Sequence, residues 1–274
     1  MRKRTRNRII ISFTAILLVA ALFLLTGFSV KVITGNNNLS SNTVEGTSLS
    51  NTENANATLQ KFAKENGLSL SEWPDDLIKL MNKNPETEDF VLNYPLLKDK
   101  QQTIDLNGEV DYNSVPLFMQ WDKRWGYTPY GDDIIAIAGC GPTCLSMVSV
   151  YLLKDTTYNP LYLAEFSEDN GYCVPGNGTA WTLMSEGAEQ LGIHSEELPL
   201  DENCIKERLE SGSPIICIMG KGDFTTEGHF IVMTDYIDGQ IKVNDPNSIS
   251  RSEKLWNYDD IQDQIENLWA FSTY

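Results

Sequence analysis

The chain has 274 residues, and its 38 acidic against 21 basic side chains give a formal net charge of −17. This acidic balance argues against nucleic acid or an anionic lipid surface as the partner of the folded part, and it tolerates cationic peptides. Hydrophobic residues make up 41% of the chain, which suits one medium-sized domain behind an N-terminal stretch that does not resemble a core.

The N-terminus has the pattern of a membrane anchor. Residues 1–8 form a basic tail, predicted to be cytoplasmic, and 9–33 are almost continuously apolar, with Lys31 the only charge. A run of this length can span a bilayer, and the preceding basic cluster predicts that the rest of the chain lies outside the cell. A signal peptide, cleaved near Gly27-Phe28-Ser29, is the alternative, and the protein would then be secreted.

Residues 34–58 are mostly Asn, Ser and Thr, which predicts a flexible linker. Residues 59–110 are predicted to form a helical preface that packs against the main domain, with a pro-segment or lid as the alternative. Three short helices are expected there: one from Leu59 to Asn66 ended by Gly67, one capped by Ser71 with Pro74 in its first turn, and one from Pro85 ended by Pro95.

The main domain, 111–274, has helical patterns first and strand patterns afterwards. A helix is predicted from Cys140 and a second at Thr179–Leu191. Strands are predicted at Pro214–Met219, His229–Ile237 and Gln240–Asn244. This order predicts an α+β fold with a C-terminal antiparallel sheet.

Cys140 is the candidate nucleophile. It lies where a loop turns into a helix, because Pro142 suits a first helical turn and an apolar run follows. The free N–H groups and the dipole of a helix N-terminus favour a thiolate there. The chain has five cysteines, and this odd number fits a free reactive thiol.

The chain has only two histidines that could act as the base. His194 follows a predicted helix and reads as a surface or packing residue. His229 opens an apolar strand, and Asp245 ends the next strand. The two meet if the intervening hairpin has the right register, and Asn247 is the alternative orienting residue.

Two turns are possible between these strands. A three-residue loop with Gly239 in the left-handed conformation pairs Tyr236 with Gln240 and makes Asp245 a diagonal neighbour of His229 on one face. A two-residue turn at Asp238-Gly239 would put them on opposite faces.

The other cysteines are predicted to have no chemical role. Cys144 follows Cys140 with three residues between them, whereas a redox pair has two, so it is expected in the core. Cys173, Cys204 and Cys217 show no ligand spacing, and neither a metal nor a cofactor is expected.

Together the motifs resemble a known family. They are Gln120–Trp125, Gly139–Thr143, Gly178–Trp181, Gly228–Phe230 and Asn244–Pro246. In this order they are similar to stand-alone relatives of the bacteriocin-leader (double-glycine) peptidases, which are papain-like cysteine peptidases found outside the membrane of Gram-positive bacteria. Trp73–Leu77 and Asn84–Thr87 also resemble sequence that often precedes this domain.

The resemblance implies a papain-like α+β fold and a role for each motif residue. Cys140 would be the nucleophile, His229 the base and Asp245 the orienting residue, while Gln120 and the Cys140 backbone N–H would bind the oxyanion. The expected function is a membrane-anchored extracellular cysteine peptidase that cleaves peptide or amide bonds through an acyl-enzyme. Alternatives are a non-catalytic binding module with the same scaffold, or an amidase or transpeptidase acting on cell-wall peptides.

Overall fold

The structure is a computed structural model that describes residues 44–100 and 102–274. The predicted basic tail (1–8), the predicted anchor (9–33) and the start of the predicted linker lie outside the described residues. Within the two described ranges, no helix has the length and apolar character needed to cross a bilayer.

The first described helix, α1 (Val44–Asn66), begins earlier than expected. The linker prediction extended to residue 58, and a helix was expected only from Leu59. The helix ends where predicted, before Gly67, whose φ is 68°. Ala55, Leu59 and Ala63 recur every four residues and are all buried, so one face of α1 packs against the rest of the preface despite its polar composition.

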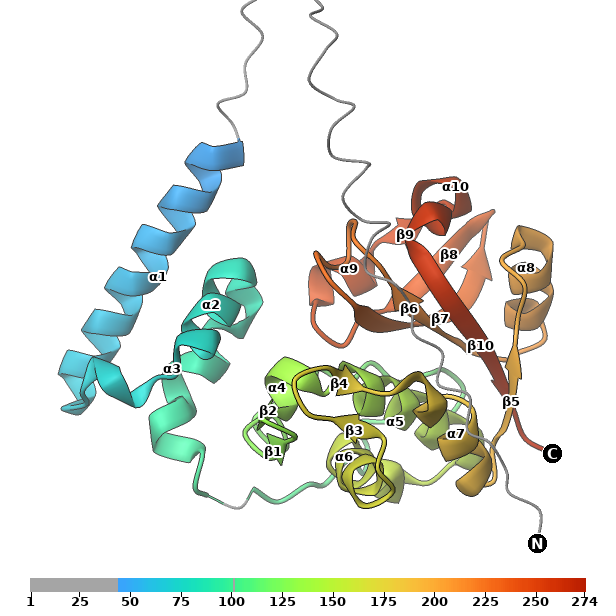
Figure 1. Ribbon diagram of the computed structural model, residues 1–274, viewed down its shortest axis with the longest axis horizontal. Coiled ribbons are helices and arrows are strands. Elements are labelled where there is room, and N and C mark those ends of the chain that lie inside the picture. The colour runs from blue at the N-terminus through green and yellow to red at the C-terminus, as the bar shows by residue number, and fades with distance from the viewer. Residues whose placement is uncertain (1–43, 101) are drawn as a thin grey trace, which may run out of the picture. The chain divides into compact units, whose positions relative to one another are not determined.

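The preface continues with four short elements (Figure 1). They are a 3₁₀ turn at Leu70–Glu72, α2 (Asp75–Lys83), a 3₁₀ turn at Pro85–Thr87 and α3 (Glu88–Leu97). The prediction that Ser71 caps α2 is wrong. Ser69 caps the preceding 3₁₀ turn in a capping box with Glu72, while Pro74 stands at the start of α2.

Pro95 lies inside α3 and does not end it, contrary to the prediction. Proline lacks the N–H that would bond the carbonyl four residues back, which here belongs to Val91. The indole Nε1–H of Trp73 donates to that carbonyl at 2.7 Å. A buried side chain therefore replaces the missing backbone donor, and this lets the helix run on to Leu97.

The preface packs against the main domain, as expected. Phe90 stacks on Tyr127 with ring centroids 4.2 Å apart, and the Tyr127 hydroxyl donates to the Phe90 carbonyl at 2.8 Å. Ala136, four residues before Cys140, belongs to the same buried cluster. The preface thus shares a core with the segment that leads to the candidate nucleophile.

The main domain contains seven α-helices among the described residues. They are α4 (Ile135–Ala138), α5 (Cys140–Leu153), α6 (Pro160–Asp169), α7 (Glu186–Gln190), α8 (Glu202–Glu210), α9 (Ile249–Glu253) and α10 (Tyr258–Ile261). Short 3₁₀ turns lie at Thr156–Tyr158, Trp181–Leu183 and Gln262–Gln264. The helix predicted at Thr179–Leu191 is interrupted, because the Ser185 backbone (φ −106°, ψ −81°) leaves the helical region before α7.

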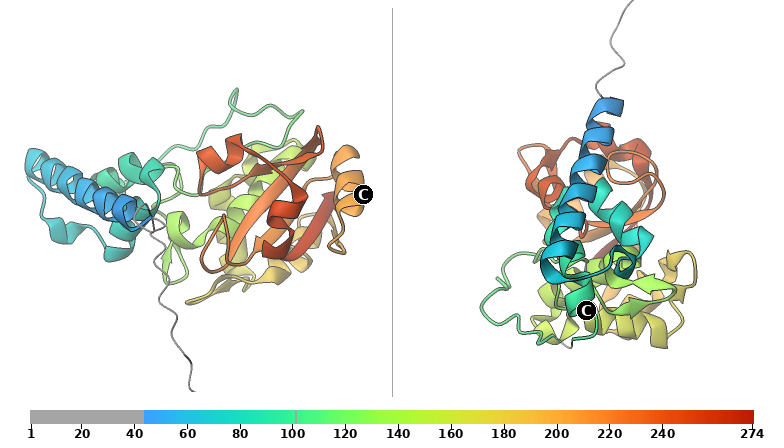
Figure 2. Two further views of the ribbon diagram at one scale, coloured as in Figure 1. Left: turned by 90° about the horizontal axis from the view of Figure 1, so that it is seen from above. Right: turned by 90° about the vertical axis from the view of Figure 1, so that its left-hand side faces the viewer.

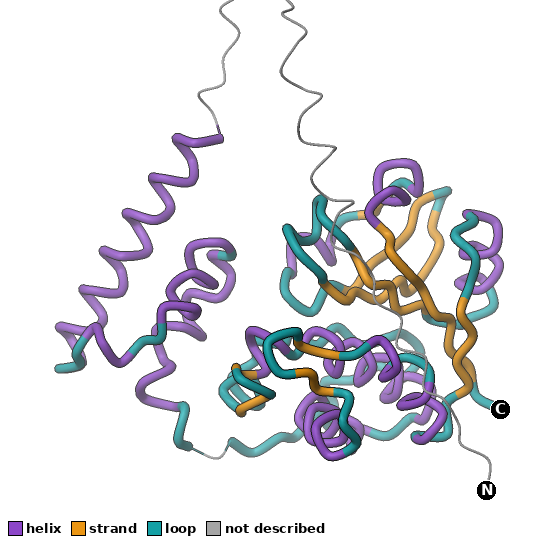
Figure 3. The backbone as a smooth tube through the Cα atoms, viewed as in Figure 1, coloured by secondary structure: helices purple, strands orange, loops and turns teal. Residues whose placement is uncertain are grey.

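A six-stranded antiparallel sheet forms the C-terminal part, and Figure 3 shows most of the strands gathered there. Its order is β5 (His194–Glu197), β10 (Ile265–Ser272), β6 (Ile215–Met219), β7 (His229–Ile237), β8 (Gln240–Asn244) and β9 (Leu255–Trp256). Two small ribbons pair β1 (Pro129–Tyr130) with β2 (Asp133–Ile134) and β3 (Cys173–Val174) with β4 (Gly178–Thr179). The predicted α+β fold with an antiparallel sheet is confirmed.

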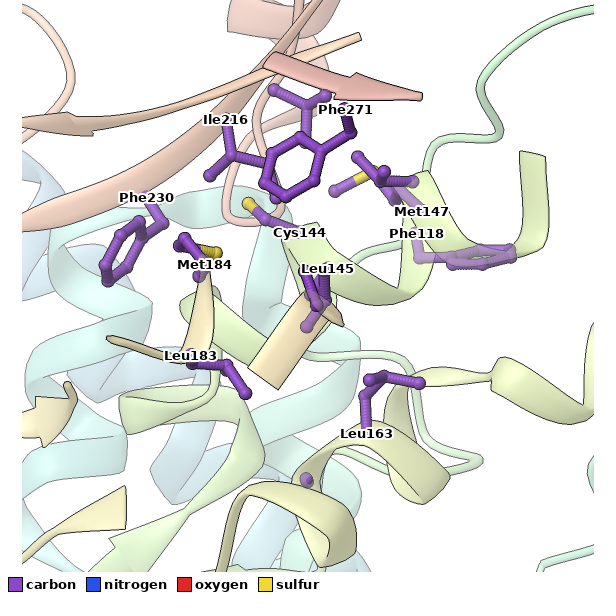
Figure 4. Packing of buried hydrophobic residues seen from close by; sticks show 14 of the residues in the cluster. Phe118, Cys144, Leu145, Met147, Leu163, Leu183, Met184, Ile216, Phe230 and Phe271 are labelled. Carbon is purple, nitrogen blue, oxygen red and sulfur yellow. The ribbon is translucent and has the colours of Figure 1, made fainter. Parts of the chain in front are cut away.

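The sheet is buried on both faces, between α5 on one side and α8 with α10 on the other. Alternate residues of β7 serve the two cores: Phe230 and Val232 belong to the α5 cluster, while Ile231 and Met233 belong to the α8 cluster. Figure 4 shows Cys144 beside Ile216 and Phe271 in the buried cluster, so it is a core residue as predicted.

The Trp73 donor predicts a measurable energetic coupling with Pro95. Trp73→Phe leaves the buried Val91 carbonyl without a donor, which we expect to cost about 1–3 kcal/mol beyond the lost packing. In a Pro95→Ala background the new N–H can bond that carbonyl, so the same substitution should cost less. Urea unfolding of the four proteins in this double-mutant cycle gives the coupling. Equal costs in both backgrounds would contradict the replacement.

Candidate active site

Cys140 is the first residue of α5, and Pro142 lies in the first turn as predicted. The backbone N–H of Cys140 is one of those that an α-helix leaves without an internal partner. The neighbouring Gly141 is tightly enclosed, since a Cβ there would lie 2.7 Å from the Cβ of Thr179 on β4. The thiol therefore stands on a rigid helix end packed closely against one wall of the site.

The hairpin between His229 and Asp245 has the turn length of one sequence alternative and, near the site, the strand register of the other. Its turn has two residues, since Ile237 pairs with Gln240 across Asp238 and Gly239, both with positive φ. The predicted three-residue loop is therefore wrong. A bulge between Met233 and Asp235 shifts the register by one residue, so that Val232 pairs with Asn244. This is the register expected next to the site, and it puts His229 and Asp245 on the same face.

His229 and Asp245 are in direct contact. The His229 Nε2 lies 2.8 Å from Asp245 Oδ1, and both side chains are buried, at 7% and 0% exposed. Since Nε2 is engaged with the carboxylate, Nδ1 is the ring nitrogen that remains for Cys140. The structure therefore brings Cys140, His229 and Asp245 together from α5, the start of β7 and the residue after β8. Figure 2 shows the helices and the sheet of this domain from two further sides.

Asp245 makes three further polar contacts, and the sequence analysis missed those with Arg251 and Ser252. Asn247 donates its backbone N–H to Oδ1 at 2.8 Å, and Arg251 Nε lies 2.5 Å from Oδ2. The Ser252 hydroxyl accepts the Asp245 backbone N–H at 2.9 Å. Asn247 thus meets Asp245 through its backbone, and Asp245 is the partner of His229. The one sequence signal that could have pointed to Arg251 is Ser248. This residue caps α9, and Arg251 follows in the first turn of that helix.

The charges of this group support one another. Burial opposes the thiolate of Cys140, but a hydrogen bond from His229, its positive charge and the Phe230 and Gly141 backbone lower the net pKa of the thiol. Burial also opposes the imidazolium of His229, yet Asp245 and then Cys140 raise its pKa to about 10. The pKa of Asp245 is lowered despite burial, by His229 and Arg251. The three shifts all favour the charged forms: the thiolate of Cys140, the imidazolium of His229 and the carboxylate of Asp245.

Gln120 lies behind the site. Its Nε2 donates to the Ala136 carbonyl at 2.8 Å and lies 3.4 Å from the Ile137 carbonyl, and its backbone N–H donates to Pro246 at 2.8 Å. It therefore ties α4 to the residue after Asp245. Both contacts of its amide NH₂ are with backbone carbonyls, and donation to an oxyanion stays a prediction.

A cleft of about 410 Å³ opens at Cys140. One wall comes from the β1–β2 and β3–β4 ribbons, and the other comes from the sheet side at Ile218, Glu227, Gly228, Phe230 and Glu266. Four exposed carboxylates line it, and none has a Lys, Arg or His partner within 4.0 Å in the described part of the chain: Asp132, Asp133, Glu227 and Glu266. The half-exposed Trp181 also lines the cleft.

The remaining cysteines and His194 differ from Cys140 and His229. Burial raises the pKa of Cys144 and Cys217, and burial followed by the charge of Glu168 raises that of Cys173. Cys173 lines the same cleft as Cys140. His194 lies exposed on β5, its Nδ1 3.2 Å from Glu189, which agrees with a surface role.

Comparisons with known proteins point to one family. The sequence model of the family described as "Peptidase_C39 like family" matches residues 112–273. Two solved structures are similar at low identity: the peptidase domain of Streptococcus ComA, a bi-functional ABC transporter involved in quorum sensing (20% identity, 58% of this chain, 99% of that one, TM-score 0.41), and a putative C39-like peptidase from Bacillus anthracis (14%, 58%, 95%, TM-score 0.41). No curated protein matches the chain. Because the family match spans more than half of the chain, the protein belongs to the Peptidase_C39 like family, as its motifs suggested.

Proposed function

We propose that this protein is a cysteine peptidase that hydrolyses peptide bonds through a Cys140 acyl-enzyme. The observation that carries the proposal is the buried contact of His229 with Asp245 beside a thiol whose pKa is lowered. Cys140 attacks the scissile carbonyl as a thiolate, and the His229 imidazolium protonates the leaving amine. His229 then takes a proton from the water that releases the acyl group, while Asp245 keeps the ring oriented.

We also propose that the enzyme acts outside the cell, tethered by its N-terminal segment. The support is the apolar run at 9–33 behind five basic residues. Such an anchor would leave the cleft open to peptides at the cell surface. The described preface does not line the cleft, whose lining runs from Tyr130 to Glu266, which favours a packing role for it over a lid.

The lowered thiol pKa predicts selective alkylation. At pH 7, iodoacetamide should modify Cys140 far faster than Cys173 and Cys204, which are also half-buried. Tryptic mapping by mass spectrometry measures each rate. His229→Ala should slow Cys140 labelling toward the rate of the other thiols, and Cys140→Ala should abolish hydrolysis with the fold retained. Equal slow labelling of all the cysteines would favour a binding module without turnover.

The ion pair predicts a bell-shaped dependence of kcat/KM on pH. The thiolate is lost as pH falls through the lowered pKa of Cys140, so the acid limb should lie below the ordinary thiol value of 9.0. The imidazolium is lost as pH rises through the raised pKa of His229, so the alkaline limb should lie above the ordinary value of 6.5.

Asp245→Asn tests the source of the alkaline limb. Removing the negative charge should lower the pKa of His229, move that limb to lower pH and reduce kcat/KM by about 10²-fold. Asp235→Asn, an exposed change on β7, the strand that carries His229, is the matched control. An unmoved alkaline limb in Asp245→Asn would show that another group protonates the leaving amine.

The carboxylates of the cleft predict a preference for cationic peptides. Peptides with Lys or Arg near the scissile bond should show a higher kcat/KM than matched peptides with Glu or Asp, and added salt should reduce the difference. Asp132→Asn should lower the preference for cationic over acidic peptides roughly 5-fold, since one pair of unit charges about 4 Å apart in water contributes about 1 kcal/mol. Glu207→Gln on α8, an exposed acid outside the cleft, should leave it unchanged. A preference for acidic peptides in the wild type would contradict this substrate class.

A further inference from the structure

The 3₁₀ turn of the preface, Pro85–Thr87, contacts the loop that follows Asp245. The Glu86 carboxylate accepts the backbone N–H groups of Ile249 at 2.6 Å and Ser250 at 3.0 Å, and it lies 3.2 Å from the Ser248 hydroxyl. Burial alone would raise the pKa of this carboxylate, but the hydrogen bonds to Ser250, Ile249 and Ser248 lower it. Glu86 is therefore a charged cap on the first turn of α9.

A second contact from the same turn reaches Asn247. The Asn84 Nδ2 donates to the Asn247 carbonyl at 2.5 Å, and the indole N–H of Trp121 lies 3.3 Å from the same oxygen. The Asn247 N–H is the group that donates to Asp245 Oδ1. Holding the Asn247 carbonyl thus fixes the residue that donates to the catalytic carboxylate.

The two contacts reach residues next to the donors of both Asp245 oxygens. Asn84 holds the residue whose N–H binds Oδ1, and Glu86 holds the turn that leads into Arg251, whose Nε binds Oδ2. The preface lies outside the family match at 112–273, and its described residues do not line the cleft.

We propose that Glu86 and Asn84 are positioning residues of the peptidase: the preface acts through the Asp245 loop to keep His229 aligned with Cys140. This proposal rests on the proposed function of that site. Because Glu86 and Asn84 contact the Asp245 loop and do not themselves line the cleft, loosening the loop should affect the chemical step more than substrate binding.

The test uses the full chain with Glu86→Gln. The glutamine amide has one acceptor oxygen and an NH₂ group, so only one of the two backbone N–H groups of Ile249 and Ser250 keeps its acceptor. We expect kcat to fall roughly 10-fold, the factor that one charge-assisted hydrogen bond supports, with KM nearly unchanged. The alkaline limb should move to lower pH, as in Asp245→Asn but by less. Glu88→Gln, two residues along and exposed, is the matched control and should behave as wild type.

A double variant shows whether Glu86 works through Asp245. In an Asp245→Asn background, Glu86→Gln should add little further loss of kcat, since the carboxylate it positions is gone. Multiplied losses, or a Glu86→Gln enzyme with a lower melting temperature but unchanged kcat and pH profile, would overturn the inference. The second variant, for the case that Glu86→Gln does not fold, is Asn84→Asp. It keeps the oxygen that accepts the Glu86 backbone N–H but loses the N–H that donates to the Asn247 carbonyl.

The wild type separates this inference from the proposed function. If the wild type shows no thiol-dependent hydrolysis and its Cys140 is unreactive, the proposed function itself is contradicted. An active wild type together with Glu86→Gln and Asn84→Asp variants that match Glu88→Gln would leave the function standing and remove the positioning role.

Discussion

A fully buried carboxylate that must stay ionised is the constraint on which the site depends. Asp245 is 0% exposed, and an unpaired charge at such a position would be strongly destabilising or would take up a proton. It stays charged because His229 and Arg251 face its two oxygens and the Asn247 backbone adds a further donor. Each of these partners must be placed by the fold, so the geometry of the sheet, of α9 and of the preface all bear on a single side chain.

The hairpin shows which part of this geometry a sequence can predict. The apolar runs of β7 and β8 specify the two strands, and both bounds agree with the structure. The turn residues Asp238 and Gly239 were ambiguous between two loop lengths, and the one-residue bulge near Thr234 has no strong local signature. Because the bulge compensates the short turn, the expected face was right although the loop behind it was wrong. Burial of the alternating side chains decided the register, and this is a tertiary effect.

The preface was harder to predict for a related reason. Helix stops such as Gly67 act locally and were found, whereas Pro95 fails to stop α3 because a distant indole supplies a donor to Val91. The Asn, Ser and Thr residues of α1 have weak helix propensity. The helix forms nevertheless, because burial of Ala55, Leu59 and Ala63 on one face stabilises it. Glu86 likewise looks like an ordinary first-turn acid in the sequence, and only the fold brings it to α9, whose residues lie more than 160 positions later.

The same reasoning explains why Cys140 is the thiol from which the proposed function expects reactivity. Cys144 lies a single helical turn after Cys140, but it faces the sheet core, where burial and the nearby Cys140 and Asp245 charges raise its pKa. Burial is the largest influence on the pKa of Cys140 as well, and it too acts against the thiolate. The difference lies in the opposite charge and the backbone donors that meet its sulfur at the helix start. The proposed reactivity of Cys140 therefore rests on the opposite charge and the backbone donors that favour its thiolate.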